Sequence, residues 1–120
     1  MTYQKEVGRW GEGIACDYLI ACGYEIIERN FHTRYGEIDI IGSKNTILHF
    51  FEVKTRTSDK FGLPEDSISE AKQDHLLNAA LLYLEQNPQF EIWQFDLITV
   101  EGKFRSPSPL ITLFDNAIVE

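Results

Sequence analysis

Residues 36–56 constrain the fold of this 120-residue chain more than any other stretch. They read GEIDIIGSKNTILHFFEVKTR, two apolar runs rich in β-branched and aromatic residues on either side of a polar stretch, GSKNT. This pattern predicts a β-hairpin whose turn is the polar stretch. Charged residues interrupt both runs at positions that a buried strand does not normally accept, namely Asp39 in the first run and Glu52 and Lys54 in the second.

Strand geometry predicts where these three charges lie. Successive side chains of a strand point to opposite faces, so Glu52 and Lys54 share one face. Asp39 joins that face if the hairpin loop holds an even number of residues. A four-residue loop, 43–46, places Asp39 opposite Phe50 and diagonal to Glu52, whereas a three-residue loop places it on the other face unless a bulge intervenes.

Two carboxylates on one strand face need a partner. At about 5 Å they repel each other by roughly 3 kcal/mol at an effective dielectric constant near 20. Such a pair shares a proton or binds a metal ion, and an all-oxygen ligand set favours Mg²⁺ or Mn²⁺ over zinc. The alternative is an ion pair of Glu52 and Lys54 on a solvated strand face, with Asp39 in a bend.

The same residues resemble a known signature. Asp39 followed by Glu52, Val53 and Lys54 after a hairpin resembles the PD-(D/E)xK pattern of the restriction-endonuclease-like superfamily. The chain also contains, in order, GRWGE at 8–12, RN at 29–30, RYGEID at 34–39, FFEVKTR at 50–56, FG at 61–62, AKQ at 71–73 and FD at 95–96. Together, over about residues 5–118, these motifs resemble the YraN-like family of small bacterial proteins, predicted endonucleases similar to Holliday junction resolvases.

The resemblance implies a fold and an activity. The fold is α/β, a restriction-endonuclease-like three-layer core in which a mixed sheet, an antiparallel hairpin plus a parallel strand, is flanked by helices. The activity is metal-dependent hydrolysis of phosphodiester bonds in DNA, endonuclease-like, with branched DNA as one option for the substrate. From the sequence alone Glu12 reads as an exposed helix glutamate, but the matching residue of resolvase-like families points into the site.

These implications give each residue an expected role. Asp39 and Glu52 would hold Mg²⁺ or Mn²⁺, with the backbone carbonyl of Val53 as a third ligand and Glu12 at a second metal or an outer water. Lys54 would orient the attacking water and stabilise the developing charge. The candidate contacts to nucleic acid are Arg34, Arg56, Lys72 and Gln73. For Lys72 and Gln73 a solvated helix face remains an equal alternative.

The remaining chain predicts a single nuclease-like domain over residues 1–120. A helix is expected over 3–22, begun by Thr2 and ended by Gly23, and its glycines at 8, 11 and 13 imply close packing or close approach to a ligand. The further expectations are a first strand at 24–31, a mobile loop at 57–69, a second helix at 69–86, a strand at 91–100 paired in parallel across that helix, and a last apolar segment at 110–119.

Composition qualifies these expectations. No leader-like or membrane-spanning apolar stretch occurs, so a cytoplasmic protein is expected. The net charge of −8 counts against binding nucleic acid, although residues 29–60 hold six basic and four acidic residues, and we expect weak, salt-sensitive affinity. Two alternatives stay open: a non-catalytic module that binds nucleic acid or a partner, and a homodimer whose hairpin charges pair across the interface.

Overall fold

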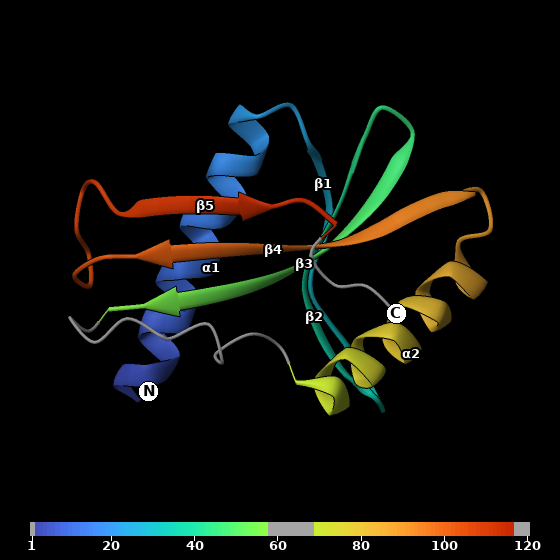
Figure 1. Cartoon of the computed structure of the whole chain (residues 1–120), viewed down its shortest axis with the longest axis horizontal. Helices are drawn as coiled ribbons and strands as arrows, with labels where there is room; N and C mark the ends of the chain where they lie inside the picture. Colours follow the sequence, from blue (N-terminus) through green and yellow to red (C-terminus); the bar gives the residue numbers. More distant parts are fainter. Residues whose placement is uncertain (1, 58–68, 117–120) are drawn as a thin grey trace.

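Two helices and five strands make up residues 2–57 and 69–116, the parts of the chain that the computed structural model describes (Figure 1). In chain order they are α1 (Tyr3–Ala21), β1 (Glu25–Thr33), β2 (Gly36–Lys44), β3 (Ile47–Arg56), α2 (Glu70–Gln86), β4 (Ile92–Glu101) and β5 (Leu110–Phe114). All of the predicted helices and strands occur, with boundaries that differ by one or two residues at most ends. Part of the polar stretch of the hairpin belongs to β2, and the last strand ends at Phe114, inside the predicted segment 110–119. The predicted loop after Arg56 and the FG motif at 61–62 lie almost wholly outside the described residues.

The five strands form one mixed sheet in the order β1-β2-β3-β4-β5. The pairs β1–β2, β2–β3 and β4–β5 are antiparallel, and β3 and β4 are parallel. Parallel neighbours need a crossover connection, and here α2 lies within it. The predicted fold class, α/β with an antiparallel hairpin and a parallel strand in one sheet, is therefore confirmed.

The helices cover opposite faces of the sheet, which gives three layers. Phe51 packs with Leu19 of α1, whereas its neighbour Phe50 packs with Leu76 and Tyr83 of α2, because adjacent strand residues point to opposite faces. In Figure 1, α1 crosses behind β3, β4 and β5, and α2 lies at the other end of the molecule. Within the described ranges, neither helix combines the length and apolarity that crossing a membrane requires.

Local signals fix the starts of both helices and the end of α1. Thr2 accepts a hydrogen bond at Oγ1 from the backbone N–H of Lys5 (3.2 Å), and Ser69 does the same for Lys72 (3.2 Å), so each satisfies one free N–H of a first turn. After α1, Gly23 has φ +97°, a left-handed conformation that favours glycine. The predicted cap and stop of the first helix are confirmed.

The central hairpin is tighter than predicted. Its strands extend to Lys44 and from Ile47, so the loop has two residues, Asn45 and Thr46, both with positive φ (53° and 68°). Two-residue loops of this conformation match the twist of hairpin strands, so the polar stretch pairs as strand rather than forming a wide turn. The predicted four-residue loop is wrong, but the loop is still even. The last observed pair, Ile40 with Phe51, places Asp39 next to Glu52 rather than opposite Phe50.

Strand β2 changes face at Asp39. Ile38 and Ile41 both lie in the core under α2, although they are three residues apart, while Ile40 lies under α1. A regular strand would place Ile38 and Ile40 on one face. Across from Asp39 on β1, Asn30 adopts a left-handed conformation (φ 52°), and the hydrogen-bonded ladder from β2 to β3 ends at Ile40. The irregularity places the Asp39 side chain beside the end of that ladder.

Candidate functional site

The bend in β2 brings Asp39 against β3. Its Oδ2 accepts a hydrogen bond from the backbone N–H of Val53 (2.9 Å), which lies next to Glu52. Burial, then the negative charge of Glu52, raise the pKa of Asp39 from 3.8 to about 8; Glu12 adds to the rise and the Val53 N–H opposes it. At neutral pH this carboxyl is therefore protonated unless a bound cation stabilises its ionised form.

Glu52 is nearly buried, with 8% of its surface exposed. One oxygen, Oε2, lies 3.3 Å from Nζ of Lys72 on α2. The other, Oε1, is buried and accepts no hydrogen bond from the described residues. A buried acceptor without a partner costs about 1–3 kcal/mol. A proton shared with Asp39 would satisfy Oε1, and so would a cation.

Two further carboxylates lie beside Asp39. Oxygens of Glu12 on α1 and Glu37 on β2 lie within 4.8 Å of each other and of an Asp39 oxygen. The side-chain amide of Asn30 donates to Oε1 of both, at 3.0 Å to Glu12 and 2.8 Å to Glu37. The predicted approach of Glu12 to Asp39 is thus observed. We call Glu12, Glu37, Asp39 and Glu52 the carboxylate cluster.

Sequence reasoning missed Glu37 and Asn30. Glu37 stands two residues before Asp39, so the period-2 rule applied to GEID was a signal that pointed to it. For Asn30 the only signal was the RN motif, since its role depends on a left-handed backbone within a strand. Asparagine is among the few non-glycine residues that adopt this conformation readily.

Close packing of α1 on β3 positions Glu12. A Cβ atom on Gly11 would lie 1.9 Å from Oγ1 of Thr55, so only glycine permits this approach. Added Cβ atoms on Gly8 and Gly13 would meet no atom within 4 Å. The predicted packing explanation holds for Gly11 and fails for the other two.

The predicted basic residues differ in their distance from the cluster. Lys54 follows Glu52 by two residues on β3 and is half-buried, and Lys72 reaches Glu52 from the first turn of α2. Arg56 ends β3, and Gln73 follows Lys72 on α2. Arg34, in the turn after β1, stacks on Tyr35 with its guanidinium carbon 4.9 Å from the ring centre. The roles of these residues, and of the Val53 carbonyl, stay predictions.

The donor set fits a hard divalent cation. Every side chain of the carboxylate cluster offers oxygen, and Mg²⁺ and Mn²⁺ prefer oxygen ligands. The buried Oε1 of Glu52 has no donor among the described residues besides the proton that Asp39 retains, which indicates missing positive charge at this pair. The residues present therefore match the cation expected from the sequence, without zinc-type ligands in the cluster.

A second polar cluster lies in the sheet near β4. Asp96 is fully buried, and its Oδ2 lies 2.6 Å from Nδ1 of His49 in a hydrogen bond. Its Oδ1 accepts from the side chain of Gln94 (2.8 Å) and the backbone N–H of Asn116 (2.7 Å). The His49 ring stacks on Phe51 with centroids 5.7 Å apart. Asp96 therefore serves a structural, hydrogen-bonding role in the sheet, and His49 packs on Phe51.

The fold and the carboxylate cluster define a class of protein: α/β proteins with a restriction-endonuclease-like core whose central hairpin carries the Asp39…Glu52-x-Lys54 pattern. Within that class the family model described as "Uncharacterised protein family UPF0102" matches residues 11–100. The chain belongs to this family, the YraN-like group that its motifs resemble.

Curated relatives agree with this assignment. A UPF0102 protein of Syntrophomonas wolfei is 48% identical over 98 residues, which cover 80% of this chain and 84% of the relative. One of Thermodesulfovibrio yellowstonii is 44% identical over 98 residues, covering 82% and 88%, and one of Caldicellulosiruptor bescii is 43% identical over 103 residues, covering 82% and 87%. Their names give the family and no activity.

Proposed function

We propose that this protein is a metal-dependent phosphodiesterase that cleaves DNA in an endonuclease-like manner. The observation that carries the proposal is the state of one carboxyl pair. Asp39 keeps a proton up to a pKa of about 8 beside Glu52, and apart from that proton the buried Oε1 of Glu52 has no donor among the described residues. A fold that only needed stability would replace or pair such groups. Shortage of positive charge at a cluster of oxygens is what a divalent cation would relieve.

Each residue of the carboxylate cluster has its own role in the proposed reaction. Asp39 and Glu52 hold Mg²⁺ or Mn²⁺, with the Val53 carbonyl as a third ligand and Glu12 in contact with a second ion or a water. When bound, the metal ion would lower the pKa of a water and neutralise charge on the phosphate. Glu37 and Asn30 hold Glu12 in place through the shared amide.

Cationic side chains handle the substrate's charge. Lys54, on the same strand as Glu52, orients the attacking water and donates to the oxygen on which charge develops. Lys72 balances Glu52 across 3.3 Å before the substrate arrives and is placed to turn toward a phosphate oxygen. Arg34 and Arg56 would contact phosphates further along the strand.

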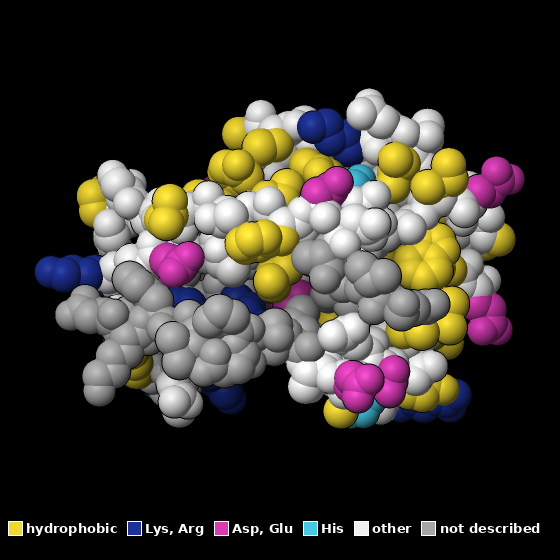
Figure 2. All heavy atoms as spheres, viewed as in Figure 1, with side chains coloured by type: hydrophobic (Ala, Val, Ile, Leu, Met, Phe, Trp, Pro, Cys, Tyr) yellow, Lys and Arg dark blue, Asp and Glu magenta, His cyan; other side chains and the backbone are white. Residues whose placement is uncertain are grey.

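Net charge supports a second candidate, a binding module without turnover. The chain carries −8, and Figure 2 shows Lys and Arg side chains at several separate places, with no continuous basic patch on this face among the described residues. Such a surface favours weak, salt-sensitive contact with nucleic acid. In this alternative the carboxylate cluster binds a cation for structure alone.

Cleavage of DNA separates the two candidates. Wild type and Asp39→Asn are incubated with branched, flapped and linear DNA in Mg²⁺, Mn²⁺ and chelator. The proposal expects cleavage by wild type only, dependent on the added metal. Binding without cleavage of any of these DNAs, under both metals, would favour the non-catalytic module.

A further inference from the structure

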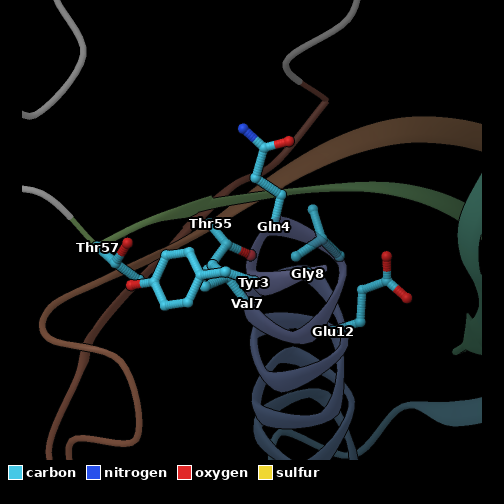
Figure 3. A pocket seen from close by; sticks show the side chains of 8 residues that line it. Tyr3, Gln4, Val7, Gly8, Glu12, Thr55 and Thr57 are labelled. Atoms are coloured by element: carbon cyan, nitrogen blue, oxygen red, sulfur yellow. The ribbon is translucent and has the colours of Figure 1, made fainter. Parts of the chain in front are cut away.

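A pocket of about 470 Å³ adjoins the carboxylate cluster between the start of α1 and the end of β3. Figure 3 shows Tyr3 and Thr57 at one end, Glu12 at the other and Gly8 between them. We propose that this pocket binds one unpaired nucleotide of the DNA, next to the phosphate that is cleaved. This inference rests on the proposed function and adds to it a preference for single-stranded segments.

The lining fits a nucleobase better than a phosphate. Among the described residues that line it there is no Lys, Arg or His, so none of them neutralises a phosphate. It offers the amide of Gln4 and the hydroxyls of Thr55 and Thr57, which match the donors and acceptors on a base edge. Tyr3, 58% exposed, provides an aromatic ring on which a base can stack, a contact that tolerates any base.

The pocket is continuous with the proposed chemistry. Glu12 belongs both to its lining and to the carboxylate cluster. Val53 also lines it, while its N–H binds Asp39. A nucleotide whose base lies by Tyr3 therefore extends its sugar and phosphate toward Asp39. A base whose edge is hydrogen-bonded to Gln4, Thr55 or Thr57 cannot use that edge to pair with a second strand. Enzymes that bind bases in pockets act on unpaired or extruded nucleotides.

Gly8 lines the pocket, and the lack of a side chain there leaves part of this space open. Glycine within a helix costs stability relative to other residues, yet a Cβ atom here would meet nothing within 4 Å. Packing therefore does not demand this glycine, in contrast to Gly11, which lies against Thr55. A side chain at position 8 would enter the pocket, so glycine there preserves room for a ligand.

The test fills the pocket without harming the fold. Gly8→Met places a flexible side chain in the pocket, and Gly13→Met is its matched control, since position 13 is also open and lies about 140° around the helix axis from position 8. Both substitutions should raise the melting temperature, because methionine is a better helix former than glycine. Tyr3→Phe keeps the stacking ring, and Tyr3→Ala removes it.

Binding is measured with two labelled hairpin DNAs, one with a short single-stranded extension and one fully paired, in Ca²⁺ and in chelator. Wild type, Gly13→Met and Tyr3→Phe should bind the extended DNA more tightly than the paired one. Gly8→Met should lose that preference by about tenfold or more, with binding to the paired DNA unchanged, and Tyr3→Ala should lose a smaller part of it.

Several results would contradict the proposal that the pocket binds an unpaired nucleotide. These are equal affinity of wild type for both DNAs, an unchanged preference in Gly8→Met, equal losses for both DNAs, or no binding to either. The proposed function fails separately, because cleavage is not part of this readout. If the protein never cleaves DNA but Gly8→Met abolishes the preference for the extended DNA, the pocket proposal stands and the nuclease proposal fails. If the protein cleaves DNA and Gly8→Met binds both DNAs as wild type does, the nuclease proposal stands and the pocket proposal fails.

Discussion

Two groups of carboxylates lie in the same sheet and differ in how well they are satisfied. Asp96 is completely buried, yet both of its oxygens have partners in His49, Gln94 and the Asn116 backbone. In the carboxylate cluster, Glu52 is almost as buried, but its Oε1 has no partner among the described residues. Asp39 beside it keeps a proton up to about pH 8.

The contrast separates a structural from a functional use of buried charge. A fully bonded polar group fixes the packing around it, whereas an unsatisfied one is costly and persists where a ligand compensates for it. Asp96 joins β4 to β3 through His49 and to the residues after β5 through Asn116. The carboxylate cluster joins α1, β2 and β3, but its negative charges are not fully balanced by cations or hydrogen-bond donors among the described residues.

The largest expected effect comes from removing the charge of Asp39. Under the proposed function, Asp39→Asn lowers DNA cleavage by at least about 100-fold, as loss of one key electrostatic contact in a site does. In wild type, Mg²⁺ at roughly ten times its Kd stabilises the fold by about 1.4 kcal/mol, and this shift vanishes in Asp39→Asn. Thermal melting with and without Mg²⁺ measures it.

Neighbouring variants sharpen the same measurement. Glu52→Gln should retain a smaller metal shift, and Lys54→Ala should retain all of it or gain, because the ammonium repels the cation. Cleavage should be lost in both. An equal metal shift in wild type and Asp39→Asn would place the cation elsewhere on the protein.

The second largest effect comes from Asp96, whose two oxygens both have hydrogen-bond partners. Asp96→Asn keeps the shape of the side chain but puts an amide among donors that need an acceptor. Leaving buried hydrogen-bonding groups unpaired should lower the free energy of unfolding by about 2–4 kcal/mol. Urea denaturation measures this loss. The stabilisation of Asp96→Asn by Mg²⁺ should equal that of wild type. Loss of this stabilisation would show that the Asp96 group and the carboxylate cluster act as one unit.

The third effect is a pH dependence in metal-free buffer. The pKa of Asp39 is about 8 in the folded protein against 3.8 ordinarily, so the folded state holds the proton more tightly. The resulting stability is fully present below about pH 4 and is lost as the pH rises to 8. The stability of wild type relative to Asp39→Asn should therefore fall by about 1–3 kcal/mol over this window, since solvent reaches the half-buried side chain.

Denaturant titrations at several pH values measure that difference. Saturating Mg²⁺ should flatten it, because the cation favours the ionised carboxylate. A relative stability that rises with pH would instead mean that Asp39 is ion-paired and ionised in the folded state.

The parts of the molecule that follow from local rules could be predicted from the sequence. Thr2 and Gly23 bound α1, and the alternation around Glu52 and the even loop put Asp39 beside it. The loop length itself was wrong, because Asn45 and Thr46 accept left-handed conformations that the composition of GSKNT does not specify. The family motifs located Glu12, whose position depends on a packing contact between Gly11 and Thr55.

Other features depend on tertiary contacts that no local pattern encodes. Periodicity predicts a regular β2, yet the strand changes face at Asp39, and this bend sets the position of Asp39 relative to Val53 and Glu37. The bonded partners of Asp96 come from three separate segments of the chain. Lys72 was recognised as a basic residue, but its contact with Glu52 depends on how α2 lies on the sheet.

The smallest effect tests the edge of the carboxylate cluster. Asn30→Asp replaces the amide that donates to Glu12 and Glu37 with a further carboxylate beside them, at a position where aspartate tolerates the left-handed backbone. Asn45→Asp is the matched control, since Asn45 has nearly the same φ (53° against 52°) in the exposed hairpin turn. Without metal, Asn30→Asp should be less stable than the control by about 0.5–1 kcal/mol, because it adds repulsion where solvent screens it only partly.

Mg²⁺ should cancel this difference in stability, since a bound cation attracts the added carboxylate. Thermal melting of both variants across a Mg²⁺ titration gives the comparison. A deficit that stays constant as Mg²⁺ rises would mean that Glu12 and Glu37 face only water, and would confine the proposed centre to Asp39 and Glu52.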